Sequence, residues 1–223
     1  SGHHQWYTVR GGSIEYVKLL EKDMLKRGVK IHTGSVVQGV RRTPAGVEIR
    51  TFSDEWKKFD SVVMASHSDQ SLKMLENPSD EEVKLLSAIK YQKNQAYLHS
   101  DTIVMPKRKR CWSSWVYASD ELDNSNPVGV SYWMNRLQPI SGDENFFQSL
   151  NPNREIKQEL IYDQKTFMHP VFDREALSAQ EKFNTIQGRN NTWYCGAWLR
   201  NGFHEDGYSS AVDILENIGM VSV

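Results

Sequence analysis

The stretch from Cys195 to Ala211 carries the strongest chemical pattern in the sequence. A run ending at Cys195 leads into a glycine-punctuated loop, and a helix is expected to begin near Asp206-Gly207. A helix start that follows a strand in an α/β fold offers free N–H groups and a positive dipole end. Such an end suits an electron-rich ligand edge, such as the N1–C2=O edge of a flavin, and Gly207 would allow close approach of a ring. An ordinary helix with Asp206 as its N-cap explains the pattern equally well.

A second pattern is Gly11-Gly12-Ser13, which precedes an expected amphipathic helix that ends at Gly28. Ser13 is a plausible N-cap for this helix. The triplet is not a P-loop, because the Lys-Ser/Thr ending is missing, and no GxGxxG motif occurs in the chain. On its own, the triplet is explained better by a structural turn than by a ligand site.

Other chemistries find less support. The sequence has no HExxH motif, no GxSxG motif and no zinc-ligand spacing beyond the adjacent pair His3-His4, so no metal site is predicted. A nucleophilic role for Cys195 is weaker than the alternative of a buried thiol at a strand end. The basic cluster from Pro106 to Arg110 is best explained as a solvated hairpin turn, so no nucleic-acid partner is predicted.

The elements that position these residues change character along the chain. Strands are expected at 6–10, 29–32, 35–41, 46–51 and 61–65, the last buried on both faces, and helices at 67–75 and from Ser79 to about Lys90. From Tyr91 to about His169 the apolar period is close to two, which indicates an antiparallel sheet. Residues 173–187 return to helix, 193–196 form a final strand, and 207–218 form the last helix.

This order predicts an α/β fold with mixed α+β character. It contains a partial FAD/NAD(P)-binding Rossmann-like domain, 6–75 and 188–223, and an inserted antiparallel-sheet substrate domain, 76–187. The pieces at the two ends of the chain are expected to come together in space.

Composition sets further bounds. The chain has 223 residues and a formal net charge of −1, so it has no overall attraction to nucleic acid or membranes. Two cysteines, Cys111 and Cys195, favour a cytoplasmic protein with free thiols, although one disulfide would also fit. No apolar run approaches the roughly 18 residues of a membrane span, so stable membrane insertion is not expected.

Several stretches resemble a known family. Gly11-Gly12-Ser13 with its helix, 30–40 and 60–65 resemble the mid-region of flavin-containing amine oxidases, and 196–211 resembles the final FAD motif of that superfamily. A narrower likeness is to the bacterial predicted NAD/FAD-binding proteins that are similar to the amino-terminal region of plant cyclopropane-fatty-acid synthases. The stretches that carry it are 67–70, 112–115, 132–138, 169–170 and 202–207.

The resemblance implies FAD as the cofactor and assigns roles to individual residues. It places the Val37 backbone at the adenine, and Ala65 and Ser66 at a strand end near the cofactor. It places Tyr208 in a substrate cage, and Asn94 where amine oxidases often have a lysine beside flavin N5, so these two are the catalytic candidates. The cofactor-binding set that it implies is Gly11, Gly12, Ser13, Val37, Ala65, Ser66, Gly196, Glu205, Asp206, Gly207 and Tyr208.

Two departures qualify this picture. The strand–GxGxxG–helix that grips the pyrophosphate is missing, so we expect a carboxy-terminal fragment that binds FAD weakly or not at all. The lysine is replaced by Asn94, which weakens the case for an amine substrate.

The resulting hypothesis is an FAD-dependent oxidoreductase that moves a hydride from a small organic substrate, lipid-like or an amine, to flavin N5. A non-catalytic binding or structural fragment and a flavin-dependent isomerase or desaturase are the alternatives. The oligomeric state is left open.

Overall fold

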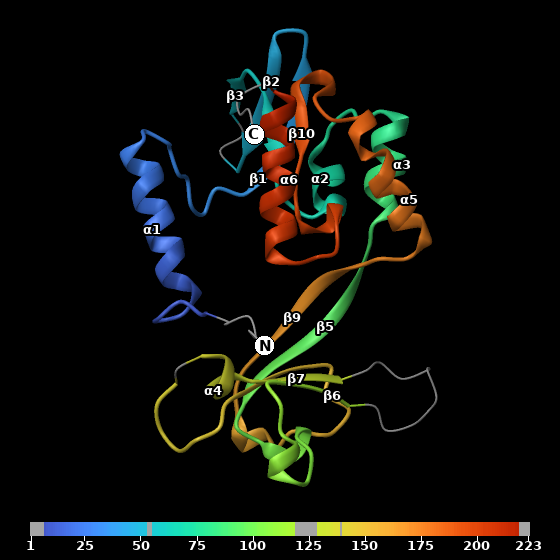
Figure 1. Cartoon of the computed structure of the whole chain (residues 1–223). Helices are drawn as coiled ribbons and strands as arrows, with labels where there is room; N and C mark the ends of the chain where they lie inside the picture. Colours follow the sequence, from blue (N-terminus) through green and yellow to red (C-terminus); the bar gives the residue numbers. More distant parts are fainter. Residues whose placement is uncertain (1–6, 53–54, 119–128, 139, 219–223) are drawn as a thin grey trace, which may run out of the picture. The chain divides into compact units, whose positions relative to one another are not determined.

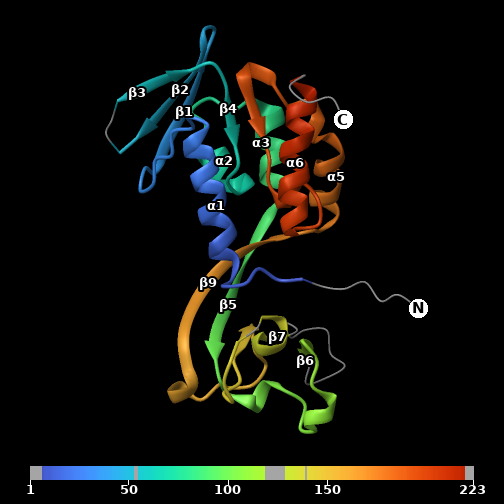
Figure 2. The same ribbon diagram turned by 60° about the vertical axis from the view of Figure 1, so that its left-hand side comes forward.

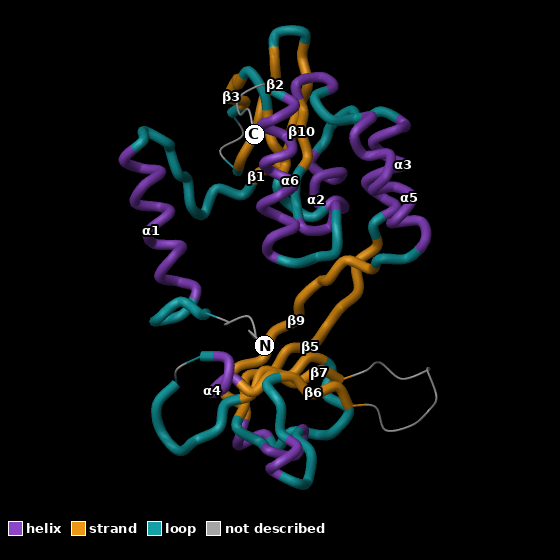
Figure 3. The backbone as a smooth tube through the Cα atoms, viewed as in Figure 1, coloured by secondary structure: helices purple, strands orange, loops and turns teal. Residues whose placement is uncertain are grey.

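The computed structural model describes residues 7–52, 55–118, 129–138 and 140–218 (Figure 1). Contacts between residues divide the chain into two compact units, each built from two separate segments. Unit 1 comprises Ser1–Ile31 and Lys93–Met168, and unit 2 comprises His32–Gln92 and His169–Val223. Helices and strands are both abundant in the described residues (Figure 3).

Unit 2 contains two small sheets and most of the helices. Its antiparallel sheet has the order β1-β2-β3, and its parallel sheet pairs β10 with β4. The strands are β1 (Val37–Thr43), β2 (Gly46–Thr51), β3 (Trp56–Phe59), β4 (Val62–Met64) and β10 (Thr192–Tyr194). The helices are α2 (Ser68–Met74), α3 (Asp80–Ala88), α5 (Arg174–Lys182), α6 (His204–Asn217) and the 3-10 turns η4 (Phe183–Thr185), η5 (Arg189–Asn191) and η6 (Ala197–Leu199).

Local sequence explains several of these boundaries. Gly46 has a φ of 131°, and a Cβ there would lie 2.4 Å from the carbonyl oxygen of Phe59, so the β1–β2 turn requires glycine. Ser79 caps α3: its hydroxyl accepts from the Glu82 N–H at 3.2 Å, and the Glu82 carboxylate accepts from the Ser79 N–H at 2.7 Å. This reciprocal pair satisfies two of the N–H groups that a helix start leaves open.

A single apolar core holds unit 2 together. Side chains from the strands and from α3, α5 and η4 meet in it and bury large aromatic and aliphatic groups. Tyr194 and Leu86 are fully buried at its centre, and Phe183 packs edge-on against both Tyr194 and Trp198. This core fixes β10 and the chain that follows it.

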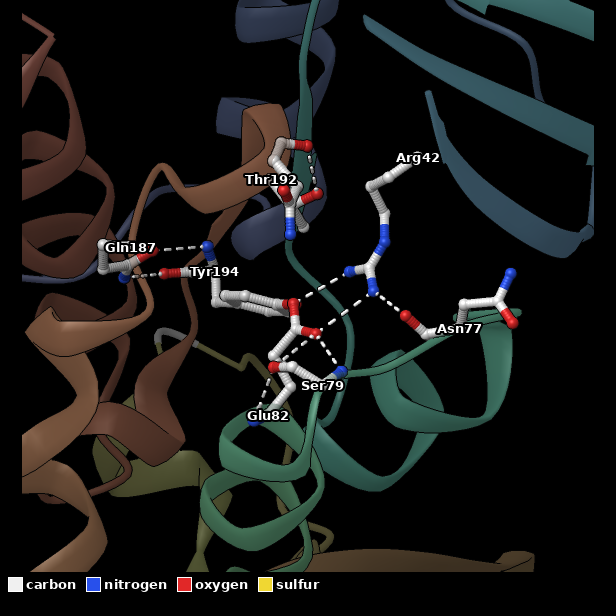
Figure 4. Close-up of polar contacts among 8 residues, drawn as sticks. Arg42, Asn77, Ser79, Glu82, Gln187, Thr192 and Tyr194 are labelled. Atoms are coloured by element: carbon white, nitrogen blue, oxygen red, sulfur yellow. Dashed lines mark hydrogen bonds and ion pairs between the residues drawn. The ribbon is translucent and has the colours of Figure 1, made fainter. Parts of the chain in front are cut away.

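A buried ion pair crosses this core (Figure 4). The side chains of Arg42 and Glu82 are 8% and 3% exposed, and Nη1 of Arg42 donates to Oε1 of Glu82 at 2.8 Å. Tyr194 donates its hydroxyl to the same oxygen at 2.7 Å, and Arg42 also donates to the Asn77 carbonyl. Burial alone would raise the pKa of Glu82, but the hydrogen bonds from Arg42, Ser79 and Tyr194 outweigh it and lower the pKa. The pair joins β1, α3 and β10.

Unit 1 is built on a five-stranded sheet with the order β6-β7-β8-β5-β9. The strands are β5 (Lys90–His99), β6 (Trp115–Ala118), β7 (Gly129–Trp133), β8 (Phe147–Leu150) and β9 (Ile161–Val171). The helices are α1 (Ser13–Lys26), α4 (Met134–Leu137), η1 (Thr102–Val104), η2 (Lys109–Cys111) and η3 (Gln158–Leu160). The pairings β6–β7, β7–β8 and β5–β8 are antiparallel, as the period of two predicts. Neighbouring strands β5 and β9 carry the chain between the units (Figure 2).

Some expected elements are absent or differ. Residues 7–10 and 29–32 form no strand. Val29 and Ile31 are exposed, and among the residues described no neighbouring strand is present to accept the backbone hydrogen bonds of 29–32. Strand β4 is not buried on both faces, because Val63 is 50% exposed. Helix α1 forms as predicted, but none of its residues is buried.

The described part of the chain contains no helix whose length and apolar character would let it cross a bilayer. Cys111 is exposed, Cys195 is buried, and both are free thiols, which excludes the single disulfide.

Candidate functional site

The parallel strands β4 and β10 end at the same edge of their sheet. Tyr194 lies opposite Met64, and the Cys195 N–H donates to the Met64 carbonyl at 3.1 Å. Parallel strands point their carboxyl ends the same way, so the chain leaves the sheet at Ala65 and Cys195 side by side, and Gly196 follows. This edge is where open α/β sheets bind ligands.

Gly196 fixes the loop at this edge. Its φ is 153°, and a Cβ there would lie 2.5 Å from Nε1 of Trp198, so any side chain would displace the indole. That indole donates to the Ser66 carbonyl at 3.1 Å, and the Gly196 N–H donates to Oγ of Ser210 at 3.0 Å. The two strand ends and helix α6 are therefore tied together.

Helix α6 begins at His204, earlier than predicted, and its N-cap is Phe203. Asp206 is consequently not the N-cap: it lies in the first turn, and its carboxylate accepts from the Phe203 N–H at 2.8 Å. Gly207 is helical, and its Cβ position lies 3.6 Å from the Ala197 nitrogen. The start of α6 thus packs beside the strand edge, and Tyr208 is 66% exposed there.

We call Ala65, Ser66, Gly196 and the α6 start, 205–208, the strand-edge site. Glu205 and Tyr208 are exposed, whereas Asp206 and Gly207 are half-buried. No side chain caps α6 at Phe203, and the N–H groups of Asp206 and Gly207 donate to the Phe203 carbonyl at 3.1 and 3.3 Å. The start of α6 therefore presents the positive end of the helix dipole to a ligand.

An apolar cleft of about 710 Å³ opens beside β1 and β4. It brings together Val37, Ala65 and Ser66, three residues that the sequence assigned to one cofactor. Its remaining lining is largely aliphatic: Val36, Val40, Ile49, Val62, Val63, Met64, Gln70, Lys73 and Met74. The volume is within the range of about 300–1,000 Å³ that small-molecule sites occupy.

The predicted residues near the amino end belong to unit 1. Gly11 and Gly12 have φ values of 85° and 87°, and Gly12, not Ser13, is the N-cap of α1. Left-handed backbone at two consecutive residues turns the chain into the helix and explains the glycine pair. The part of these residues in cofactor binding stays a prediction.

The outer face of the unit 1 sheet is apolar and open. Trp115 lies opposite Tyr132 and Tyr117 opposite Val130, so these side chains share one face; Trp115 and Tyr117 are 54% and 66% exposed. Gln148 lies opposite both Tyr132 and Leu98, so Leu98 is on the same face, and it is 40% exposed. The opposite face packs on a core of Val104, Met105, Phe147 and Ile156.

Asn94 lies on this outer face, because every second residue of a strand points to the same side and Ala96 and Leu98 follow it at that spacing along β5. It is 6% exposed, and its side-chain oxygen accepts from Nδ2 of Asn151 at 2.7 Å. The amide is therefore held in a fixed orientation. The two predicted catalytic residues, Asn94 and Tyr208, lie in different units.

A buried histidine-serine chain, which the sequence did not single out, lies beneath the sheet. Nε2 of His99 is 2.9 Å from Oγ of Ser149, which is 2.7 Å from Oγ of Ser131. The Asp101 N–H donates to Nδ1 of His99 at 3.1 Å, so Nε2 carries the proton in the neutral ring and donates to Ser149. Burial lowers the pKa of His99. A histidine that donates to a fully buried serine cannot activate it as a nucleophile.

A family model described as flavin containing amine oxidoreductase matches residues 2–185. The chain belongs to this flavin-containing amine oxidoreductase family. Its mixed helix-and-sheet fold agrees with that assignment. A comparison with curated proteins finds none that matches the chain.

Solved structures with the fold of this amine oxidoreductase include three enzymes of different activity. A reduced UDP-galactopyranose mutase has a TM-score of 0.67 at 11% identity, covering 96% of this chain and 53% of its own. A CLA-producing fatty acid isomerase from P. acnes has a TM-score of 0.56 at 17% identity, and the match covers 82% of this chain and 47% of the isomerase. A putrescine oxidase bound to putrescine has a TM-score of 0.58 at 10% identity, and the match covers 93% of this chain and 53% of the oxidase. The chain spans about half the length of these proteins.

The residues present fit a flavin cofactor in part. The cleft at Val37 has the size and apolar lining for the nucleoside end, and the α6 start presents the positive end of a helix dipole to an electron-rich ring edge. The sequence contains no GxGxxG turn to hold the pyrophosphate. Apolar room and a helix dipole are therefore present where the resemblance places the two ends of FAD, and the GxGxxG turn is absent from the 223-residue sequence.

Proposed function

We propose that this chain is the carboxy-terminal part of an FAD-dependent oxidoreductase that oxidises a hydrophobic organic substrate. The flavin, when bound, supplies the hydride acceptor. The cleft at Val37, Ala65 and Ser66 holds the adenosine end, and the α6 start binds the electron-rich edge of the ring. The positive end of the α6 dipole stabilises negative charge on the ring, which is the charge that accompanies reduction.

Gly207 is the observation that carries this proposal. It is helical, and a Cβ would meet nothing closer than 3.6 Å, so the fold does not require glycine at this position. Glycine nevertheless costs a helix about 1 kcal/mol relative to alanine. Close approach of a flat ligand to the helix start explains why a residue without a side chain stands there.

The substrate class follows from the open face of the unit 1 sheet. Trp115, Tyr117 and Leu98 expose apolar surface that would be costly without a ligand or covering chain. The fixed amide of Asn94 is polar and lies on the same face. We infer a lipid-like substrate that this face holds by apolar contact, with Asn94 orienting its reacting end. Tyr208 is proposed as a further substrate contact.

The test compares FAD with FMN, which lacks the adenosine end. We expect the 223-residue chain to leave gel filtration colourless, and to bind FAD only at concentrations approaching about 1 mM in a flavin-fluorescence titration, because the phosphate grip is missing. Val37→Asp should weaken FAD binding and leave FMN binding unchanged, whereas Gly207→Ala should weaken both. Val83→Asp, an exposed site on α3 away from the cleft, is the matched control.

A yellow protein after gel filtration contradicts the expectation of weak binding. Equal affinities for FAD and FMN, unaltered by Val37→Asp, contradict the adenosine site. If no flavin binds at about 1 mM, the role of these residues is refuted for this chain and a non-catalytic module is favoured.

A further inference from the structure

Helices α3 and α5 of unit 2 pack against each other (Figure 1), and a groove runs between them. It has a volume of about 470 Å³. Leu85 and Ala179 form its floor, both 4% exposed. The groove exists because the side chains that face each other across it are small: Ser87, Ala88, Ser178 and Ala179.

The rim of this groove is positively charged. Lys84 contributes one cation from α3, and Arg174 and Lys182 contribute two from α5. Positions 174, 178 and 182 are each four residues apart, so Ser178 lies between the two α5 cations on one stripe. Within the described ranges, none of the three cations has an ion-pair partner.

The one acid among the described residues that line the groove, Glu175, is paired with a lysine outside the lining. Glu175 accepts from Nζ of Lys90 at 2.6 Å, and Asp173 accepts from the same group at 3.1 Å. This contact ties the chain after α3 to the start of α5. The groove is therefore a local excess of positive charge in a protein whose formal net charge is −1. Such a site attracts anions selectively.

An apolar floor beneath an unpaired cationic rim defines one ligand chemistry. We propose that the α3–α5 groove binds a free anionic amphiphile with one carboxylate and an unbranched apolar tail. The tail lies on Leu85, Ala88 and Ala179, and the carboxylate is bound by the ammonium groups of Lys84 and Lys182 and by the serine hydroxyls. This site does not depend on the flavin proposal, because it shares no residue with the strand-edge site.

The experiment titrates the chain with dansyl-undecanoate and follows the dansyl emission. We expect saturable 1:1 binding, displacement by laurate, and no displacement by dodecanol, which has the same tail without the charge. The double variant Lys84→Gln, Lys182→Gln should weaken binding about tenfold. Ser178→Trp should block the groove sterically, and Lys57→Gln, an exposed lysine on β3, should bind as the parent does.

Thermal unfolding of each variant distinguishes lost binding from lost structure, because all four substituted residues are exposed. Displacement by dodecanol as strong as that by laurate would show a purely apolar site and overturn the proposal. Unchanged affinity in both the double variant and Ser178→Trp would place the probe elsewhere. Binding to anionic vesicles without displacement by laurate would assign the groove to a membrane surface and also overturn it.

Discussion

Replacing Glu82 by glutamine tests how much the buried polar network stabilises unit 2. The carboxylate accepts five hydrogen bonds: two from Arg42, two from Ser79 and one from Tyr194. The hydroxyls of Ser79 and Tyr194 can rotate away, but the guanidinium and the Ser79 N–H cannot. A glutamine NH₂ group would therefore face a fixed donor at either end.

The magnitude follows from burial. Removing one member of a buried ion pair leaves an uncompensated charge and costs about 3–5 kcal/mol. With glutamine at position 82, Arg42 keeps one amide oxygen and the Asn77 carbonyl as acceptors but loses its counter-charge. At about 2–4 °C per kcal/mol for a chain of this size, the melting temperature should fall by about 6–20 °C.

Glu81→Gln is the matched control, one residue away in the same helical turn. Glu81 pairs with Arg189 at 2.6 Å, and the two side chains are 41% and 58% exposed. An exposed pair of this kind contributes about 0–1 kcal/mol. Urea denaturation of both variants measures the difference in unfolding free energy. Equal effects of the two substitutions would refute the claim that the core ion pair holds unit 2.

Acid denaturation provides an independent check on Glu82, whose pKa is lowered in the folded state. Its contribution to the unfolding free energy is present above the unfolded pKa of about 4.3 and is lost as pH falls through the folded pKa. The unfolding free energies of Glu82→Gln and the parent should therefore become equal at that pH. Burial lowers the pKa of His99, so unfolding free energy should fall as pH drops below about 6.5, by at most about 1.4 kcal/mol per pH unit, and His99→Gln should remove this slope in a denaturation series. Gly196→Ala should cost more than about 1 kcal/mol, whereas Gly142→Ala, with a φ of 109° and no neighbour within 4 Å, should cost less; equal losses would show that φ alone matters. In the intact flavoprotein, Tyr208→Phe should lower kcat/KM while changing stability by less than about 0.5 kcal/mol, because the side chain is exposed. Unchanged turnover would remove Tyr208 from the substrate site.

The sequence predicted the elements whose signals are local. The β2 strand begins at Gly46 and ends at Thr51, as the expected strand at 46–51 does. Ser79 with acidic residues in the next turn marked the start of α3. Period-two patterning between Tyr91 and His169 identified the antiparallel sheet. Each of these signals is contained within a few neighbouring residues.

What the sequence missed depends on partners distant along the chain. The run at 29–32 has strand composition but no strand beside it, and composition cannot report a missing partner. Asp206 has a capping residue's chemistry, yet Phe203 is the N-cap because packing beside Ala197 sets where α6 begins. Arg42 and Tyr194 are 152 positions apart in number, so their shared contact with Glu82 left no local trace.

Within the candidate site, the residues that could be predicted are those at the ends of strands. Val37, Ala65 and Ser66 were assigned by resemblance, and the structure brings them to one cleft. The α3–α5 groove had no such signal, because small residues on two helices mark nothing until the helices pack.

The route of β5 and β9 has a consequence for how this architecture tolerates change. Strand β5 leads from unit 2 into unit 1 and β9 leads back, and the two are neighbours in one sheet, so the entry and exit of the 93–168 segment are adjacent. A host with adjacent attachment points accepts exchange of the whole segment with little cost in loop closure. Evolution, or a protein engineer, can thus exchange the 93–168 segment and keep unit 2 by cutting only at these two strands.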